Sequence, residues 1–315
     1  NNSDNYKIRF VDATWFHKGS RNGRKEFENG PRLPGAVYWD ISDISTPGEL
    51  FPADNPKNLK NMFPPGWLVG RALEQMGVSN STTLVVYGRE GTLFAPRVWY
   101  TLWRYYCGGK VRLLQGSLEE WIAKGGPVDV TPISEKCSKS QAPRAKDLMG
   151  PEFCHRWWGH HHPSISPTAR SRLVDLRFVL DFLDEKREQM NRKAGDNSSL
   201  ELLEEDEKVH CPTILARDRC SEGLSPSVII DTRGSSFISS GHIPGAVHIP
   251  YSSLTRTEDP LKLKSPVELE NLLRDALGND SFVRLRRHPP VLTCGTGVSV
   301  CTLALVLLEL GLPEP

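Results

Sequence analysis

The stretch PPVLTCGTGVSVCTLALVLLELG, residues 289–311, decides the fold of this chain. An apolar run ends at Cys294, a short loop with two glycines and two hydroxyl side chains follows, and a leucine-rich helical pattern then begins. A strand that passes through a Gly-containing loop into a helix is the repeating unit of a parallel α/β sheet. Because chemistry in such sheets gathers at the carboxyl ends of the strands, the thiol of Cys294 is the first candidate nucleophile.

The same pattern of strands, turn, loop and helix occurs twice along the chain. The first copy reads VDATWF, LPGAVYWDIS and VVYGREG, and the second reads IIDTRGSSF, IPGAVHIP and VLTCGTG. Each copy has an apolar strand that ends in Asp, a Pro-Gly-Ala-Val turn, two further strands, a Gly-containing loop and a helix. We therefore expect an α/β protein of two domains, each a parallel sheet flanked by helices. Alignment of the third strands places Tyr87 opposite Cys294, so the first copy lacks the nucleophile.

Changes in composition along the chain predict the domain boundaries. Residues 1–145 form the first domain, and residues 146–170 form a linker rich in Pro, Ser and charge. Residues 171–315 form the second domain, which opens with the amphipathic helix LVDLRFVLDFLDEKREQ and carries a polar, acidic insertion at about 187–226. The second copy lacks a counterpart of the KVRLLQGSLEEWIAKGG segment that follows the last helix of the first copy, so we expect its C-terminal end to be truncated.

Composition excludes several classes of function. The 39 Lys and Arg residues nearly balance the 38 Asp and Glu residues, so no global basic field supports binding to nucleic acid or to a membrane surface. The seven cysteines are odd in number and lack C-x-x-C spacing, which argues against a disulfide framework or a zinc ribbon and favours a reducing compartment. The CHRWWGHHH cluster invites a metal ion, but three adjacent histidines cannot all face one ion, and we predict no metal site.

The loop after Cys294 is predicted to hold an anion. A loop between a strand end and a helix N-terminus points successive backbone N–H groups into one concavity, and the helix dipole adds positive potential. We expect a lowered pKa for the Cys294 thiol, and Gly295 and Gly297 would let the backbone curl around the sulfur. Cys301, about two turns into the helix, is predicted to pack in the core, and His242 is predicted to be structural because its turn recurs in both copies.

These motifs resemble the tandem rhodanese family, in which the first domain is inactive and the second carries the thiol. The segments VDATWF, PGAVYWDIS, APRVWYTLW and GHIPGAVHIP and the cysteine loop carry the resemblance, whereas the linker and the acidic insertion fall outside it. Within the family, CGTGVS is similar to the loop of the mercaptopyruvate sulfurtransferases. The resemblance implies that Cys294 takes sulfur from 3-mercaptopyruvate as a persulfide, releases pyruvate and passes the sulfur to a thiol, without a cofactor.

The resemblance also implies roles for individual residues. The loop that holds the persulfide would comprise Gly295, Gly297, Val298 and Ser299, and Thr296 matches the hydroxyl used in proton handling. Family members that use thiosulfate carry charged residues in the loop, whereas this loop is neutral and suits the monoanionic 3-mercaptopyruvate. Arg233 matches the arginine that meets the anionic end of the substrate, and the alternative for Arg233 is an ion pair within its own lobe.

A serine–aspartate–histidine relay of the family would reach the thiol from the first domain. Ser42 takes the position of the aspartate, with Asp43 next to it, and Asn61 takes the position of the histidine. Asparagine cannot shuttle a proton at neutral pH. Either the relay is dispensable, or the enzyme is slow, or another group substitutes.

Other functions remain as alternatives. The acceptors that the family implies are thioredoxin and small thiols, in the cytoplasm or the mitochondrion. The chain could instead use thiosulfate, or serve as a sulfur-relay protein for tRNA thiolation that passes sulfur to a ubiquitin-like carrier, or be a non-catalytic scaffold. Phosphatases of this fold need an arginine six residues after the cysteine, and Val300 at that position excludes them.

Overall fold

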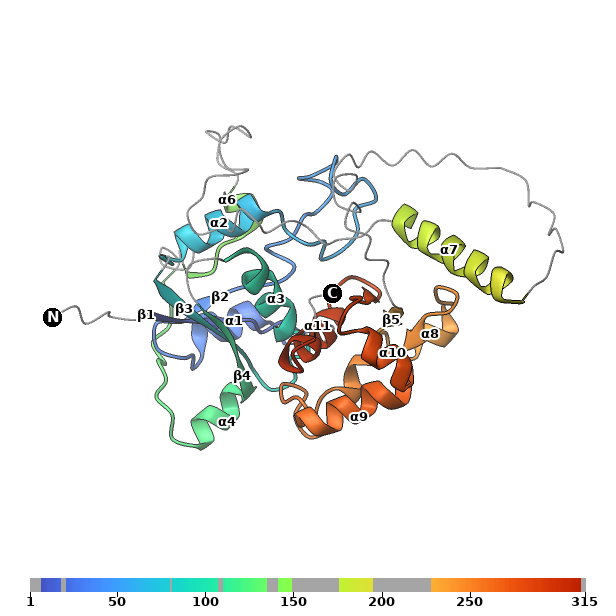
Figure 1. The fold of residues 1–315 in the computed structure, drawn as a ribbon. Coiled ribbons are helices and arrows are strands. Elements are labelled where there is room, and N and C mark those ends of the chain that lie inside the picture. The colour runs from blue at the N-terminus through green and yellow to red at the C-terminus, as the bar shows by residue number, and fades with distance from the viewer. Residues whose placement is uncertain are drawn as a thin grey trace.

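The computed structural model describes residues 7–17, 21–79, 81–106, 110–134, 141–148, 176–194 and 228–312. Within these ranges the chain forms two lobes, which we call the first lobe (up to residue 148) and the second lobe (from residue 176) (Figure 1). The predicted linker from residue 149 onward, with its histidine cluster, lies outside the described residues, as does the predicted insertion from residue 195 onward.

The first lobe is built on a parallel sheet, which has four strands among its described residues. The strand order is β2-β1-β3-β4, and parallel neighbours of this kind need crossover connections, which the helices supply. The strands are β1 (Lys7–Asp12), β2 (Val37–Tyr38), β3 (Thr82–Gly88) and β4 (Val111–Ser117). The helices are α1 (Gly23–Asn29), α2 (Gly66–Gln75), α3 (Ala95–Tyr105), α4 (Leu118–Ala123) and α6 (Ala145–Leu148).

The described part of the second lobe repeats the same arrangement with three parallel strands in the order β6-β5-β7. The strands are β5 (Ile229–Asp231), β6 (Val247–His248) and β7 (Val291–Thr293). The helical segments are α7 (Leu176–Ala194), α8 (Ser236–Ser239), the 3-10 turn η2 (Tyr251–Ser253), α9 (Pro266–Leu277), α10 (Asn279–Arg284) and α11 (Val300–Glu309). The predicted two α/β domains with parallel sheets are confirmed, and the described residues provide no counterpart of β4 beside β7.

The predicted amphipathic helix at the start of the second domain is α7. Val179 and Phe182 of α7 pack against Ile229 and Val291 of the second sheet. The helix continues to Ala194, so the polar segment predicted from about residue 187 begins inside it.

Strand register corrects the alignment of the two copies by one residue. Asp12 lies opposite Tyr87 in the first sheet, and Asp231 lies opposite Thr293 in the second. Tyr87 is therefore the counterpart of Thr293, and the expected match of Tyr87 with Cys294 is wrong. Gly88 takes that position, so the first copy still lacks a thiol there.

The two lobes share one core. Val298 and Leu305 of the second lobe are buried in the hydrophobic cluster of the first lobe, together with Leu261. Helix α11 packs against α3, and the two helices lie side by side at the centre of the molecule (Figure 1). The residues that follow the cysteine are thus held from both sides.

Among the described residues, no helix combines the length and apolar character that crossing a membrane requires.

Candidate active site

The predicted nucleophile lies at the carboxyl end of β7. Cys294 follows the last residue of this strand directly, as the sequence predicts, and its side chain is a free, partly buried thiol. Six residues separate β7 from α11, and the thiol begins this loop. The thiol is therefore reachable from the surface and still close to packed structure.

The loop that follows Cys294 carries backbone N–H groups. Within the described residues, the N–H groups from Gly295 to Val300 donate no hydrogen bond to another group of the chain. The hydroxyls of Ser299 and Thr232 lie 3.2 Å apart and tie the end of the loop to the end of β5. Backbone donors without internal partners at the N-terminus of a ten-residue helix favour a bound anion.

The two loop glycines differ in their backbone conformation. Gly297 has φ +68°, a left-handed conformation that favours glycine, and a Cβ there would come within 3.3 Å of the Arg97 side chain. Gly295 is outside the left-handed region, and an added Cβ would meet no atom within 4 Å. The predicted need for glycine therefore holds at Gly297, and the structure shows no steric need for glycine at Gly295.

The other loop side chains are neutral and differ in exposure. Thr296 is exposed, whereas Val298 is only 4% exposed because it is inserted into the core of the first lobe. A charged side chain in place of Val298 would have to be buried there. The structure thus gives a physical reason for a neutral residue at this point of the loop.

Arg97, from α3 of the first lobe, reaches this loop and was missed by sequence reasoning. Its Nη1 donates to the carbonyl oxygen of Gly297, and its Nη2 donates to the carbonyl oxygen of Asn61 at 3.0 Å. The guanidinium also lies over the ring of Phe63, 4.6 Å from its centroid. The signal in the sequence was a charged arginine among the apolar residues of the helical segment APRVWYTLW. Burial of an arginine costs free energy, so a buried arginine is expected to have specific partners.

The positions that match the relay come together only in part. Ser42 Oγ donates to Asn61 Oδ1 at 3.0 Å and accepts a hydrogen bond from Trp15 Nε1 at 2.8 Å. Asp43 instead pairs with Arg24, whose Nε lies 3.1 Å from Oδ2. Ser42 and Asn61 therefore form a neutral hydrogen-bonded pair, and Asp43 is engaged by an arginine of its own lobe.

Arg233 also pairs within its own lobe. Its Nε donates to both oxygens of Asp231, at 3.1 and 2.9 Å, and its Nη2 donates to the carbonyl oxygen of Gly241 at 2.8 Å. The hydrogen bonds with Asp231 hold the pKa of Arg233 above its usual value, and electrostatic interaction with Cys294 contributes in the same direction. The ion pair that the sequence left as an alternative is present, and a contact of Arg233 with substrate stays a prediction.

Cys301 is a core residue, as predicted, but its place in the helix differs. Helix α11 begins only at Val300, so Cys301 lies in its first turn and not two turns in. Its Sγ is 3.5 Å from the carbonyl oxygen of Gly297, and burial raises the pKa of this thiol to about 12. Cys301 is therefore protonated near neutral pH and packs beneath the loop.

His242 has the structural surroundings that the sequence predicts. Its ring stacks on Phe237 with the centroids 3.9 Å apart. Its Nδ1 lies 3.2 Å from the carbonyl oxygen of Phe237. These contacts hold the turn in shape within the second lobe.

Comparison with known proteins finds a family model that matches the second lobe and relatives that match almost the whole chain. Residues 216–314 match the family model described as a rhodanese-like domain. The thiosulfate sulfurtransferase of Rattus norvegicus is 27% identical over 312 residues, which cover 98% of this chain and 81% of the rat protein. The 3-mercaptopyruvate sulfurtransferase of the same organism is also 27% identical over 312 residues, with 98% and 81% covered. The second lobe therefore carries a rhodanese-like domain, and relatives named as sulfurtransferases match almost the whole chain.

Solved structures show the rhodanese fold over the whole chain. The 3-mercaptopyruvate sulfotransferase SseA from Escherichia coli matches with a TM-score of 0.61 and 22% identity, covering 99% of this chain and 91% of that one. The yeast mitochondrial complex I sub-stoichiometric sulfur transferase subunit matches with a TM-score of 0.61 and 20% identity, covering 99% and 87%. Both lobes are thus rhodanese-like, with Gly88 in the first where the second has Cys294.

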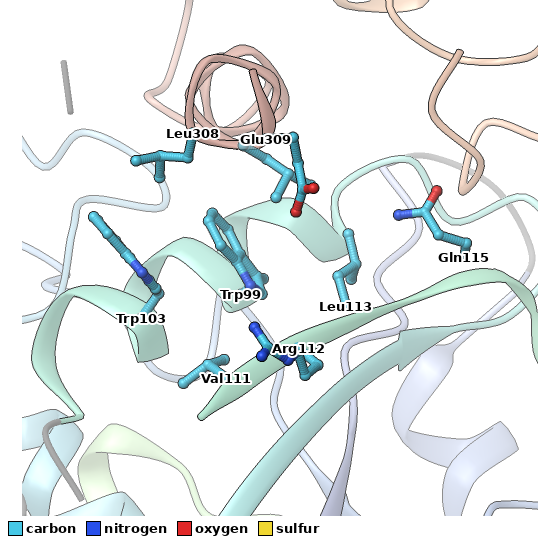
Figure 2. Close-up of a pocket in the computed structure, with 9 residues that line it drawn as sticks. Trp99, Trp103, Val111, Arg112, Leu113, Gln115, Leu308 and Glu309 are labelled. Carbon is cyan, nitrogen blue, oxygen red and sulfur yellow. The ribbon is translucent and has the colours of Figure 1, made fainter. Parts of the chain in front are cut away.

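A cavity of about 270 Å³ lies between the two rhodanese-like lobes, away from the cysteine (Figure 2). It is lined by residues of α3, β4 and the C-terminal part of α11, namely Trp99, Trp103, Val111, Arg112, Leu113, Gln115, Leu305, Leu308 and Glu309. Cys294 precedes the opposite end of α11, and ten helical residues span about 15 Å. This cavity is therefore separate from the cysteine loop.

The histidine cluster in the sequence also suggested a metal site. No group of three or more His, Cys, Asp and Glu side chains in the described residues is suited to hold an ion. The histidine cluster that prompted the question lies outside those residues.

Proposed function

We propose that this protein is a sulfurtransferase of the rhodanese type that moves sulfane sulfur from 3-mercaptopyruvate, through a persulfide on Cys294, to a thiol acceptor. The observation that carries the proposal is the partly buried thiol of Cys294 at the start of a loop whose amides, from Gly295 to Val300, have no internal acceptor. Such a loop stabilises a thiolate and, after reaction, the anionic outer sulfur of a persulfide.

The reaction runs in two steps. The Cys294 thiolate attacks the sulfur of 3-mercaptopyruvate, an S–S bond forms, and the C–S bond breaks with its electron pair left on carbon as the enolate of pyruvate. Protonation of that carbon releases pyruvate, and we assign the proton handling to the exposed hydroxyl of Thr296. An acceptor thiolate then attacks the outer sulfur, takes it as a new persulfide and regenerates the Cys294 thiolate. No cofactor enters this scheme.

The neutral loop supports the choice of donor. Thr296 and Val298 bring no charge, and the burial of Val298 against the first lobe disfavours a charged replacement. A monoanionic carboxylate such as 3-mercaptopyruvate therefore suits the loop better than the dianion thiosulfate. Thiosulfate stays the second candidate, because relatives with both names match this chain at the same identity.

The acceptor and the surroundings follow the family. We propose thioredoxin or small thiols as acceptors, in the cytoplasm or the mitochondrion. Transfer to a ubiquitin-like sulfur carrier is the alternative, and the resemblance to a sulfur transferase subunit of mitochondrial complex I favours testing protein acceptors. We assign residues 1–145 to the inactive domain and residues 171–315 to the catalytic domain, with residues 146–170 as the linker.

The test is release of pyruvate from 3-mercaptopyruvate with dithiothreitol as acceptor, beside formation of persulfide from thiosulfate. We expect faster turnover with 3-mercaptopyruvate and complete loss of activity in Cys294→Ser. The matched control is Cys301→Ser, which replaces the buried thiol of the same segment by a hydroxyl that can also donate to Gly297, and it should retain activity. A preference for thiosulfate would overturn the donor assignment, and activity in Cys294→Ser would overturn the nucleophile.

A further inference from the structure

We propose that Arg97 is a positioning residue for Cys294, which acts across the lobe boundary by fixing the Gly297 carbonyl and by placing an uncompensated positive charge beside the cysteine loop. The inference rests on the proposed function, because it concerns the same thiol. It assigns to the inactive first lobe a direct part in shaping the site of the second.

The partners of Arg97 are unusual for a buried arginine. Arg97 is only 4% exposed. Its guanidinium donates to two backbone carbonyls, those of Gly297 and Asn61, and lies over the ring of Phe63. A buried guanidinium ordinarily lies against a carboxylate that balances its charge. Arg89 of the same lobe follows that rule, since its Nη2 lies 3.3 Å from Asp12 Oδ2.

Electrostatic interactions of Arg97 point to the cysteines. Burial lowers the pKa of Arg97, and the opposing charge interactions come from Cys301, Cys294 and Tyr105. No carboxylate stands among these groups. The positive charge of Arg97 is therefore directed toward the loop that holds the thiol.

The hydrogen bond to Gly297 also fixes the shape of the loop. The carbonyl oxygen of Gly297 accepts from Arg97 on one hand and from the thiol of Cys301 on the other. In a trans peptide the C=O group and the following N–H group point in opposite directions. Holding the Gly297 carbonyl on the Arg97 side thus turns the N–H of Val298 away from the guanidinium and keeps it available to an anion.

Other titratable groups near the thiol are balanced or neutral. Among the described residues, the titratable groups that interact with Cys294, Arg97 or Arg233 include Tyr105 on α3, Cys301 on α11, Asp231 at the end of β5, Arg233 after it, and His248 on β6. Burial raises the pKa of Tyr105 and of Cys301 to about 12 each, so both are neutral near pH 7. The charge of Arg233 is balanced by its ion pair with Asp231 at 2.8 Å.

The contacts of His248 lie within the second lobe and involve no charged side chain of the loop. Its Nε2 lies 2.6 Å from the carbonyl oxygen of Arg233, and its ring stacks on Phe237. It is thus engaged within the second lobe. Among the described residues, Arg97 remains as the buried cation of this site whose charge no neighbouring carboxylate offsets.

The experiment measures the ionisation of Cys294 directly. Full-length protein is alkylated with iodoacetamide across a range of pH, and modification at Cys294 is read by fragment ions so that Cys301 is counted apart. Arg97→Gln keeps an amide donor for Gly297 but removes the charge, and Arg97→Lys keeps the charge but not the fork that reaches two carbonyls. Arg89→Met is the matched control, because it removes a buried arginine of the same lobe that does not touch the loop.

We expect the apparent pKa of Cys294 to rise in Arg97→Gln by about one unit, which lowers the alkylation rate near neutral pH about tenfold. Arg97→Lys should recover part of this loss, and Arg89→Met should lower the melting temperature without moving the pKa. An unchanged alkylation profile in folded Arg97→Gln overturns the inference. If that variant does not fold, a profile in Arg97→Lys equal to that of the parent protein overturns the part of the inference that needs the fixed Gly297 carbonyl. Absence of pyruvate release in the parent protein overturns the proposed function alone, because alkylation needs no sulfur transfer.

Discussion

Gly297 is the residue at which the conformation of the loop is decided. Its φ of +68° is accessible to glycine at little cost, and its carbonyl oxygen receives donors from both lobes. Gly295, two residues earlier, has neither feature. A sequence pattern gives the two glycines equal weight, whereas the backbone distinguishes them.

This difference predicts unequal effects of two alanine substitutions. Gly297→Ala forces an L-residue into the left-handed region, at a cost of about 1–2 kcal/mol, and presses a methyl group toward Arg97. We expect its kcat/KM for sulfur transfer to fall about tenfold or more. A tenfold loss corresponds to about 1.4 kcal/mol of activation free energy. Gly295→Ala meets open space and should retain most activity. Equal losses in steady-state assays of the two variants would contradict the assignment.

Among the elements, α11 carries the loop and joins the lobes. All of its residues from Cys301 to Leu307 are buried, because one side packs in the first-lobe core through Leu305 and another packs in the second-lobe core through Leu303 and Val306. A helix that is apolar all round is a helix enclosed on all sides. The sequence after the cysteine is thus rich in leucine because α11 is buried in the core that the two lobes share.

Truncation of Leu305 tests this enclosure. Leu305→Ala should lower the free energy of unfolding by about 2–5 kcal/mol, because it removes a buried side chain and enlarges the cavity of Figure 2, which Leu305 lines. Leu308→Ala is the matched control on the same helix, and it should cost less because Leu308, which lines the same cavity, is only partly buried. Urea unfolding curves measure both. A larger loss in Leu308→Ala would mean that α11 is not enclosed as described.

At the scale of the whole molecule, polar contacts supplement the shared core. Lys262 of the second lobe lies 2.7 Å from the carboxylate of Glu120 in the first lobe. The backbone N–H of Leu263 donates to Gln115 Oε1 at 3.0 Å, beside the same contact. These bonds connect β4 and α4 of the first lobe to the segment before α9 in the second lobe.

The ion pair between Glu120 and Lys262 predicts that the contact between the lobes weakens in acid. Hydrogen bonds from Lys124 and then Lys262 lower the pKa of Glu120 below its ordinary value of 4.5. A carboxyl with a lowered folded-state pKa stabilises above its ordinary pKa, and the contribution is lost as pH falls through the folded-state value. The melting temperature should therefore fall below about pH 4.5, and less steeply in Glu120→Gln.

The control for this prediction is Glu270→Gln, which removes a carboxylate that pairs with Arg274 inside α9 and does not join the lobes. Tryptophan emission from Trp99 and Trp103 at the interlobe cavity reports separation of the lobes apart from global melting. If emission changes with pH equally in Glu120→Gln and in the parent protein, the bridge to Lys262 does not hold the lobes.

The sequence by itself determined the duplicated parallel sheets, the position of Cys294 at the end of β7 and the neutral character of its loop. These features are local: strand and helix periodicities, turn residues and loop composition are complete within a few neighbouring residues. The match of Tyr87 with the cysteine failed by one residue, because strand register depends on pairing between segments and not on the strand itself.

Only the tertiary structure decided how Arg97 reaches Gly297, how Ser42 meets Asn61 and why Arg233 pairs with Asp231. Arg97 and Gly297 are 200 residues apart in the chain, and no local pattern encodes a contact of that range. Their meeting follows from the packing of α3 on α11, which is set by the buried apolar faces of both lobes together. The sequence is enough to propose Cys294 as the nucleophile, whereas the fold places the charge that we propose sets its ionisation.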